Sequence, residues 1–346
     1  MRIDFDLSRN ELHLGPLPGV QRVLDSSAAS LNRYPADAGI ARLVEQISAL
    51  HDVPRDQVVV GAGSVGVLDA LLHARPQVNT STAFGTPTFD EYAALVTRAG
   101  GNCAAVPSTP PGTQALDAIL SRVDASTRQV ILAAPHNPTG STVSVDELIR
   151  FRRALPKSAL LVVDQAYAEF DMTTTSDTLC QIVTELDGVL VLRSFSKAYG
   201  LAGLRIGYGV FSSAALAAKV RIAVPTYSVN SVAVAAAGES LRHQRELRER
   251  VAGVVESRRR LEAFLIRHGL FCGTESQGNF VWLATRESNS LFWHLRSDGI
   301  ASREYPGLGV RITIQSEISV DAVLTSLRTL LAQRHVRGRA FADCNA

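Results

Sequence analysis

Residues 189–211 read VLVLRSFSKAYGLAGLRIGYGVF, and this stretch decides the fold class. Val189–Leu192 is a short, continuous apolar run, which is typical of a strand buried on both faces. A polar turn that contains Lys197 and several glycines follows, and Arg205–Phe211 then predicts a further strand. The pattern therefore predicts two strands joined by a turn that presents a lysine at the end of the first strand.

Similar apolar runs alternate with helical segments along the preceding part of the chain. They are Gln57–Val60, Thr80–Phe84, Ala104–Val106, Val130–Ala133 and Leu160–Val163. Helices are expected between them, and the pair Ser144 and Glu147 forms a capping-box pattern that opens one at Val145–Leu155. Continuous apolar strands between helices predict an α/β fold with a mainly parallel sheet covered by helices on both faces.

The pattern of apolar and charged residues changes after about residue 235. The elements expected there are a long charged helix Glu239–His268, a strand Asn279–Ala284, a helix Ser290–Asp298, a strand Val310–Ile314 and a helix Val320–Gln333. We therefore expect a large domain at residues 31–235 and a smaller α+β domain at residues 236–334. Residues 1–30 are expected to join the smaller domain as an amino-terminal arm, and residues 335–346 to form a flexible tail.

Composition restricts the class of protein. Apolar residues make up 46%, charged residues 20%, and the formal net charge is +2, so neither a nucleic-acid nor a membrane partner is expected. The basic residues between Arg242 and Arg260 alternate with glutamates, which predicts a solvated helix face. No segment has the apolar length of a signal peptide or a membrane span. The cysteines lie far apart, which argues against a metal site or disulfide framework and favours a cytoplasmic protein: Cys103, Cys180, Cys272 and Cys344.

Lys197 is the strongest candidate for a catalytic group. Ligands of an open α/β sheet bind outside the carboxyl ends of its strands, which is where this lysine is expected. An amine there suits a Schiff base with an aldehyde cofactor, while Ser194, Ser196 and Arg205 suit a phosphate on the same cofactor. A solvated lysine in a loop is the alternative, and it would be favoured for an isolated lysine.

Two other strand ends favour the cofactor interpretation. Asp164 follows Leu160–Val163, and a buried carboxylate needs a cationic partner such as a protonated pyridine nitrogen. That pairing keeps the pyridine ring an electron sink. Asn137 lies in the turn PHNPTG after Val130–Ala133, where it can donate to a phenolate oxygen. For Asn137 alone, a structural Asx turn is an equally good interpretation.

A glycine-rich turn precedes a helix expected at Val65–Ala74. Its residues, Gly61-Ala62-Gly63-Ser64, expose backbone N–H groups that suit an anion such as phosphate. A dinucleotide-binding fingerprint is the alternative, but no acidic residue follows a second strand at the required distance. That alternative would also leave Lys197 and Asp164 unexplained.

Five segments together carry a resemblance to a known family. They are SFSKAYGLAGLRIGY (194–208), PHNPTG (135–140), VVDQAY (162–167), NRYP (32–35) and VRITI (310–314). They resemble the fold-type I aminotransferases of class I/II, and among these the histidinol-phosphate aminotransferase family and its aromatic-aminotransferase relatives. The resemblance runs from about Leu7 to about Leu331. It implies an aspartate-aminotransferase-like fold with a seven-stranded sheet in a cofactor-binding large domain, pyridoxal 5′-phosphate (PLP) as cofactor, and a homodimer with shared active sites.

The resemblance also implies roles for the catalytic residues. Lys197 matches the lysine that holds PLP as an internal aldimine and moves the proton of the substrate α-carbon. Asp164 matches the carboxylate that pairs with the pyridine nitrogen. Asn137 and Tyr167 match the pair that hydrogen-bonds the 3′-oxygen of the cofactor and lowers the pKa of the aldimine.

Further positions match contacts to the cofactor phosphate and ring. Ser194, Ser196 and Arg205 match phosphate ligands, assisted by the backbone N–H groups of Ser64 and Val65. Phe89 and Ala166 match the residues on the two faces of the ring. Tyr34 matches a tyrosine that reaches the cofactor phosphate of the neighbouring subunit.

The substrate is expected near three other residues. Arg311 matches the arginine that binds the substrate α-carboxylate through two parallel hydrogen bonds. Arg303 and Tyr227 are expected near the substrate side chain. The chain departs from the family pattern in its amino-terminal motif, Asn10-Glu11-Leu12-His13-Leu14-Gly15, and in the short loop between Arg303 and Arg311. The sequence therefore gives stronger support to the cofactor chemistry than to the identity of the substrate.

Three functional hypotheses follow. The first is an aminotransferase that moves an amino group between histidinol phosphate or an aromatic amino acid and 2-oxoglutarate. The second is a PLP-dependent lyase on the same scaffold, such as an amino-acid phosphate decarboxylase, which would share Lys197, Asp164 and Arg311. The third is a non-catalytic regulator, which would need an appended DNA-binding domain for which this chain is not expected to have room.

Overall fold

The structure is a computed structural model that describes residues 2–27, 29, 31–75, 78–108, 114–173, 176–270 and 275–336. Its main sheet has seven strands in the order β2-β8-β7-β6-β5-β3-β4. Neighbouring strands are parallel, except that β8 runs antiparallel to both β2 and β7. The predicted α/β fold with a mainly parallel seven-stranded sheet is confirmed. The strands are β2 (Val58–Gly61), β3 (Ser81–Thr86), β4 (Asn102–Pro107), β5 (Thr127–Ala133), β6 (Leu160–Asp164), β7 (Val189–Ser194) and β8 (Gly207–Phe211).

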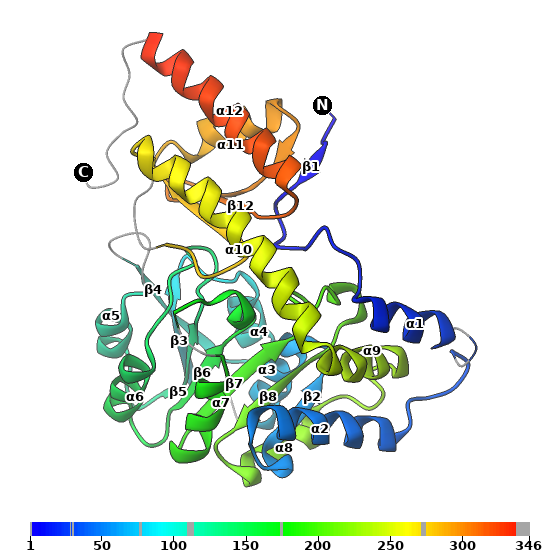
Figure 1. The fold of residues 1–346 in the computed structure, drawn as a ribbon. Coiled ribbons are helices and arrows are strands. Elements are labelled where there is room, and N and C mark those ends of the chain that lie inside the picture. The colour runs from blue at the N-terminus through cyan, green and yellow to red at the C-terminus, as the bar shows by residue number, and fades with distance from the viewer. Residues whose placement is uncertain are drawn as a thin grey trace.

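Helices cover both faces of this sheet (Figure 1), so β6 and β7 are buried along their whole length, and their residues before the strand ends are apolar. Leu160 and Val162 of β6 pack in one cluster with α3 (Gly63–Ala74), α4 (Glu91–Arg98) and α8 (Ala214–Ala223). Leu161 and Val163 point to the opposite face, because successive side chains of a strand alternate. The helices of that face are α2 (Asp37–His51), α5 (Leu116–Ser121), α6 (Val145–Ala154) and α7 (Ser176–Glu185).

The start of α6 follows directly from the sequence. Ser144 Oγ accepts a hydrogen bond from the backbone N–H of Glu147 at 3.3 Å, and Glu147 Oε2 accepts one from the backbone N–H of Ser144 at 2.9 Å. This capping box satisfies two donors that a helix start otherwise leaves unpaired. The predicted capping box is confirmed.

A smaller antiparallel sheet lies beyond the main one, in the order β11-β12-β9. Its strands are β9 (Phe280–Ala284), β11 (Arg303–Tyr305) and β12 (Gly309–Thr313), and α11 (Ser288–Ser297) and α12 (Glu317–Val336) accompany them (Figure 1). The strand β1 (Phe5–Asp6) pairs in parallel with β10 (Ile300–Ala301), so the amino terminus lies with this sheet. The domain boundaries at residues 30, 235 and 334 stay predictions, and residues 337–346 of the expected tail lie outside the described residues.

The single long helix expected at Glu239–His268 is wrong. Two helices, α9 (Ser231–Arg242) and α10 (Gln244–Arg267), meet at His243, whose φ of −106° and ψ of 44° are not helical. Helix α9 packs against α1 (Pro18–Ser27) and α2, whereas α10 packs against α12 and β9, so the two helices run in different directions (Figure 1). Packing against two different parts of the fold overrides a charge pattern that continues across the junction.

Three short 3₁₀-helices complete the described elements, at Arg55–Gln57, Ala168–Phe170 and Ala202–Leu204. The last of these lies in the turn between β7 and β8, beside Lys197. Among the helices that the structure describes, none combines the length and the apolar character needed to cross a bilayer.

Candidate active site

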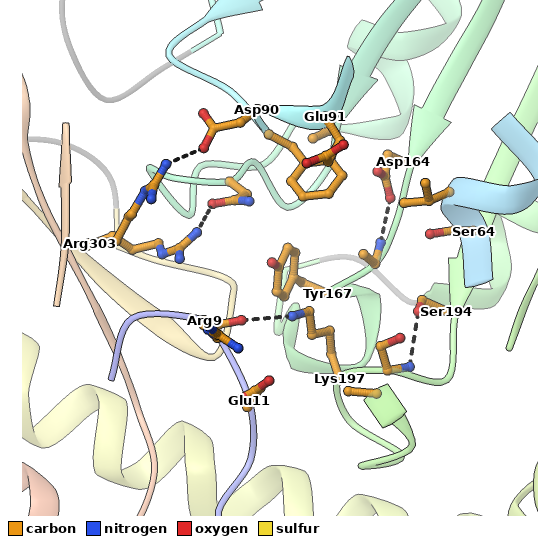
Figure 2. Close-up of a pocket in the computed structure, with 18 of the residues that line it drawn as sticks. Arg9, Glu11, Ser64, Asp90, Glu91, Asp164, Tyr167, Ser194, Lys197 and Arg303 are labelled. Carbon is orange, nitrogen blue, oxygen red and sulfur yellow. Dashed lines mark hydrogen bonds and ion pairs between the residues drawn. The ribbon is translucent and has the colours of Figure 1, made fainter. Parts of the chain in front are cut away.

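A pocket of about 620 Å³ lies at the carboxyl ends of β3, β5, β6 and β7 (Figure 2). This is the edge of the sheet at which α/β proteins bind ligands. Tyr34 and Tyr227 are not among the residues that line it. The other predicted site residues all do: Ser64, Val65, Phe89, Asn137, Asp164, Ala166, Tyr167, Ser194, Ser196, Lys197, Arg205, Arg303 and Arg311.

Lys197 enters the pocket from the turn after β7 (Figure 2). Its Nζ donates a hydrogen bond to the carbonyl oxygen of Arg9 at 3.1 Å and lies 5.7 Å from the centre of the Tyr167 ring. Burial, together with the positive charge of Arg311, lowers the pKa of Lys197 to about 8, against an opposing effect of Glu11. A substantial fraction of the amine is therefore neutral near pH 8, and the neutral form is the one that attacks a carbonyl carbon.

Asp164 is the last residue of β6, and its carboxylate is held on both oxygens. Oδ2 accepts a hydrogen bond from the hydroxyl of Tyr92 at 2.7 Å, and Oδ1 accepts one from the backbone N–H of Ala166 at 3.1 Å. Burial raises the pKa of Asp164, whereas these two hydrogen bonds lower it. Burial outweighs them, so the pKa of Asp164 is raised overall, and a buried carboxylate with fixed donors on both oxygens suits a ligand with a positive charge.

The first turn of α3 faces the pocket through Ser64 and Val65. Ala62, which precedes the helix, has no side-chain cap for the N–H groups of this turn. Ser196 and Arg205 line the same pocket, and Arg205 Nη1 donates to Ser196 Oγ at 3.4 Å. Free helix N–H groups beside hydroxyls and a guanidinium form a site that suits a phosphate group.

A glycine allows this turn to approach the sheet. A Cβ added at Gly207 would collide with the backbone nitrogen of Ser64 and would lie 2.8 Å from the carbonyl oxygen of Arg193. Only glycine therefore lets β8 bring the start of α3 against the end of β7. Arg205 has a left-handed backbone, with φ of 54°, which is strain of a kind that collects at functional sites.

Arg311 reaches the pocket from β12 of the smaller sheet and is only 6% exposed. Its Nη1 donates to Asn137 Oδ1, and its Nη2 donates to the carbonyl oxygen of Ser8 at 2.5 Å. Since Oδ1 is engaged, Asn137 presents its amide N–H groups to an acceptor. The guanidinium thus connects the amino-terminal segment, the turn after β5 and the smaller sheet.

Tyr167 is buried beside Lys197, with its ring edge-on to Phe280 at a centroid distance of 5.1 Å. Its hydroxyl oxygen accepts a hydrogen bond from Asn10 Nδ2 at 2.9 Å. Burial raises the pKa of Tyr167, so the hydroxyl keeps its proton and can donate it to a further acceptor.

The rim of the pocket carries an ion pair between two distant parts of the chain. Arg303 Nη2 and Asp90 Oδ2 are 2.5 Å apart, and their side chains are 51% and 60% exposed (Figure 2). Tyr305, two residues after Arg303 on β11, lines the pocket, as does Phe89. The rim therefore combines two aromatic rings with an arginine whose charge is already compensated.

Several residues that line the pocket were not predicted from the sequence. Tyr92 lies in α4 (Glu91–Arg98), whereas the predicted Phe89 precedes that helix, so a shared helix face could not have indicated Tyr92. No local signal indicated Arg9 or Glu11, because contacts far apart in the sequence place their segment against the smaller sheet, among them the pairing of β1 with β10 and the hydrogen bond from the Thr313 N–H to the Leu7 carbonyl. The lining residues that were not predicted are Ser8, Arg9, Glu11, Asp90, Glu91, Tyr92, Ala133, Pro135, Ala202, Gly203 and Tyr305.

Tyr34 and Tyr227 lie elsewhere, stacked on one another. Their ring centroids are 4.4 Å apart, and the residues are 77% and 61% exposed. Tyr227, expected near the substrate side chain, therefore lies outside the pocket of its own chain. The role expected for Tyr34 concerns a neighbouring subunit and stays a prediction.

The family model for aminotransferase class I and II matches residues 2–327. The chain belongs to this family. An aromatic amino acid aminotransferase of Thermobifida fusca is 38% identical over 324 residues, which cover 93% of this chain and 89% of that protein. Another aromatic amino acid aminotransferase, from Mycobacterium marinum, is 36% identical over 335 residues, covering 95% and 92%.

Solved aminotransferases share the fold. Histidinol-phosphate aminotransferase from Sinorhizobium meliloti, in complex with pyridoxal-5′-phosphate, superposes with a TM-score of 0.86 at 26% identity, covering 95% of this chain and 92% of that one. Aspartate aminotransferase from Thermus thermophilus with maleate has a TM-score of 0.82 at 20% identity, covering 94% and 91%, which shows likeness of fold alone. The predicted aspartate-aminotransferase-like fold is confirmed.

PLP is the cofactor of this class I/II aminotransferase, and the chemistry of the pocket fits it. The pocket holds an amine of lowered pKa, a buried carboxylate, and a helix start with hydroxyls and a guanidinium for a phosphate. When bound, PLP supplies a protonated pyridine ring that withdraws electrons from the substrate α-carbon. The chain is thus a PLP-dependent aminotransferase, as its sequence predicted.

Proposed function

We propose that this aminotransferase moves the amino group of an aromatic amino acid to 2-oxoglutarate. The observation that carries this choice is the Arg303–Asp90 ion pair in a pocket that Tyr305 also lines. The Tyr305 ring offers apolar contact to a neutral side chain, and the paired arginine presents no uncompensated charge to it. The names of the relatives at 36–38% identity support the same substrate class.

Histidinol phosphate is the less favoured donor. Its phosphate would need cationic partners near the rim, where Asp90 already engages Arg303 and Glu91 also lines the pocket. A phosphate dianion brings two negative charges beside Asp90 and Glu91, whereas the distal carboxylate of 2-oxoglutarate brings one, which Arg303 can balance. The likeness to the Sinorhizobium meliloti enzyme is one of fold and cofactor, and does not favour this donor over an aromatic amino acid.

The pocket residues have separate tasks in this proposal. Lys197 is the covalent anchor of the cofactor and, once released, the base that moves the proton of the substrate α-carbon; its lowered pKa suits both tasks. Arg311 binds the α-carboxylate, with its guanidinium oriented by Asn137 and the Ser8 carbonyl.

Five other side chains, together with the first turn of α3, hold the cofactor in this proposal. Asp164 keeps the pyridine nitrogen protonated, and Tyr92 and Ala166 keep that carboxylate in place. Tyr167 donates to the 3′-oxygen. The phosphate is held by the first turn of α3 together with the residues that share its part of the pocket wall, namely Ser194, Ser196 and Arg205.

The second substrate, 2-oxoglutarate, carries a distal carboxylate that an aromatic amino acid lacks. We propose that this carboxylate takes the place of Asp90 on Arg303. An exposed ion pair contributes only about 0.2–1 kcal/mol, so the exchange costs little. One pocket can thereby accept a neutral and an acidic side chain in turn.

A homodimer is part of the proposal. The stacked rings of Tyr34 and Tyr227 lie exposed on the chain surface, and Leu31 and Ile222 are also exposed, by 67% and 86%. Large exposed apolar side chains favour a contact with a partner.

If Tyr34 serves the neighbouring site, mixing subunits of Lys197→Ala and Tyr34→Phe should restore activity, because each hybrid has one complete site. The cytoplasmic location stays a prediction.

The substrate proposal is tested by a screen of amino donors against 2-oxoglutarate, with glutamate formation as the readout. Phenylalanine, tyrosine and tryptophan should react with a higher kcat/KM than histidinol phosphate. Lys197→Ala should form no glutamate. Release of carbon dioxide from the amino acid instead of glutamate formation would indicate the lyase, and a preference for histidinol phosphate would overturn the aromatic assignment.

A further inference from the structure

Asn10 is a fully buried residue in the segment that follows β1, and it lies at the edge of the active site. Its backbone is left-handed, with φ of 56°, a conformation that asparagine adopts more readily than most residues. Three contacts hold this conformation in place. Asn10 N–H donates to Thr313 Oγ1 at 2.9 Å, Thr313 Oγ1 donates to Asn10 Oδ1 at 3.0 Å, and Asn279 Nδ2 donates to the Asn10 carbonyl at 3.2 Å.

These contacts determine which way the Asn10 amide points. Thr313 Oγ1 already accepts the backbone N–H of Asn10, so its own proton is available for an acceptor, and that acceptor is Asn10 Oδ1. The amide nitrogen must then lie on the other side, where it donates to the hydroxyl oxygen of Tyr167 at 2.9 Å. A hydroxyl oxygen that accepts from Asn10 cannot direct its own hydrogen back toward that amide.

We propose that Asn10 is a positioning residue that orients the hydroxyl proton of Tyr167 into the pocket, toward the 3′-oxygen of the cofactor. This inference rests on the proposed role of Tyr167. Hydrogen bonds in a chain polarise one another, so donation from Asn10 also makes Tyr167 a stronger donor. The phenolic oxygen of the cofactor is thereby stabilised in its ionised form.

The same segment contacts the two other reactive groups of the site. The carbonyl oxygen of Ser8 accepts from Arg311. The carbonyl oxygen of Arg9 accepts from Lys197 (Figure 2). Thr313, which fixes Asn10, lies two residues from Arg311 on β12. Residues Ser8–Asn10 therefore bring the carboxylate-binding arginine, the lysine and the tyrosine into one arrangement.

The test uses the holoenzyme and two variants of Asn10. Asn10→Asp keeps the size of the side chain and an oxygen for Thr313, but removes the N–H donor. Asn10→Gly keeps the left-handed backbone at little cost and removes the whole amide. Asn79 is the matched control, since it also has φ of 56° but lies in an exposed turn outside the site, so Asn79→Asp and Asn79→Gly test the substitutions themselves.

The readout is the pH titration of the visible absorbance of bound PLP, with the PLP dissociation constant as a second measurement. Losing one neutral hydrogen bond corresponds to roughly a two- to tenfold change, so the absorbance pKa should rise by roughly 0.3–1 unit in both Asn10 variants. In the Tyr167→Phe background Asn10→Gly should produce no further rise, because Asn10 then has no hydroxyl to orient, whereas the new carboxylate of Asn10→Asp raises the pKa by its charge in either background.

Two results would overturn the inference alone. One is an unchanged absorbance pKa in Asn10→Gly, and the other is an equal rise in Asn10→Gly with and without the Tyr167 hydroxyl. Neither depends on which amino donor is used, so the substrate proposal would survive both. Wild-type protein that showed no visible cofactor band would instead overturn the proposed function itself.

Discussion

The hydroxyl of Tyr92 donates a hydrogen bond to Asp164 Oδ2 at 2.7 Å. Tyr92 belongs to α4 and Asp164 ends β6, so the contact joins a helix to the strand end that the sequence singled out. Burial and the neighbouring carboxylate raise the pKa of Tyr92 well above its usual range, so Tyr92 remains the donor. The negative charge of Asp164 therefore depends on a side chain that carries no charge of its own.

Tyr92→Phe should weaken PLP binding and slow turnover. Without the Tyr92 hydroxyl the pKa of Asp164 rises further, and less of the carboxylate is available to keep the pyridine nitrogen protonated. A hydrogen bond to a charged group contributes about 1.5–3 kcal/mol, so we expect a loss of roughly tenfold or more in kcat/KM and in PLP affinity. Fluorescence titration of the apo-protein with PLP measures the affinity. As a control, Tyr305→Phe removes another pocket hydroxyl and should leave the PLP affinity unchanged. Equal PLP affinities in Tyr92→Phe and wild type would contradict the prediction.

Covalent loading of the apo-protein with PLP should speed up with rising pH, with a midpoint near 8 set by Lys197. Arg311 lowers the pKa of Lys197 and Glu11 raises it. Arg311→Met should therefore move the midpoint to higher pH, and Glu11→Gln should move it to lower pH. Stopped-flow absorbance records the rate. A wild-type midpoint near the ordinary value of 10.5, or shifts of the same sign in the two variants, would rule this account out.

Asp90→Asn should change the use of the two substrates unequally. The variant frees Arg303 from its partner, so the distal carboxylate of 2-oxoglutarate no longer has to replace Asp90. An exposed pair of about 0.2–1 kcal/mol corresponds to a fall of roughly 1.5- to 5-fold in KM for 2-oxoglutarate. The KM for phenylalanine should not fall. Asp69→Asn, which removes the half-buried partner of the exposed Arg98 at 2.9 Å outside the pocket, should leave both values unchanged. If Asp90→Asn behaved like Asp69→Asn, the exchange mechanism would be wrong.

His136 should make the apo-protein less stable in mild acid. Burial lowers the pKa of His136 to about 3 from an ordinary value of 6.5. The His136 ring therefore binds a proton below about pH 6.5 in the unfolded chain, but only below about pH 3 in the folded chain. The contribution to the free energy of unfolding is constant above this window and falls by about 1.4 kcal/mol per pH unit as pH falls through it.

Urea unfolding of wild type and His136→Asn at pH 7.5, 6.5 and 5.5 tests this expectation. The variant removes the titrating ring, although it also removes the hydrogen bond between His136 Nδ1 and Thr139 Oγ1 at 2.8 Å. It should therefore be less stable than wild type at pH 7.5, and the difference should shrink by about 1.4 kcal/mol at pH 5.5. Parallel pH profiles for the two proteins would show that His136 is not the group responsible.

Local sequence was sufficient for the strands and for the residues that follow them. Val189–Leu192 and Leu160–Val163 are apolar without interruption, which is possible only for strands covered on both faces, and β7 and β6 lie there. Lys197 and Asp164 follow from the same pattern, because the carboxyl ends of parallel strands lie along one edge of a sheet. The capping box at Ser144 is local in the same sense.

Tertiary structure alone decided the contacts that tune these residues and the path of the chain between the two sheets. The Lys197–Arg9 contact joins residues 188 positions apart, and the helix break at His243 serves two packing surfaces that no local window contains. A strand or a helix cap depends on neighbours within a few residues, so the local sequence is enough to predict it. The pKa of a buried amine and the direction of a hydroxyl depend on whichever distant groups share its cavity, and only folding brings those groups together.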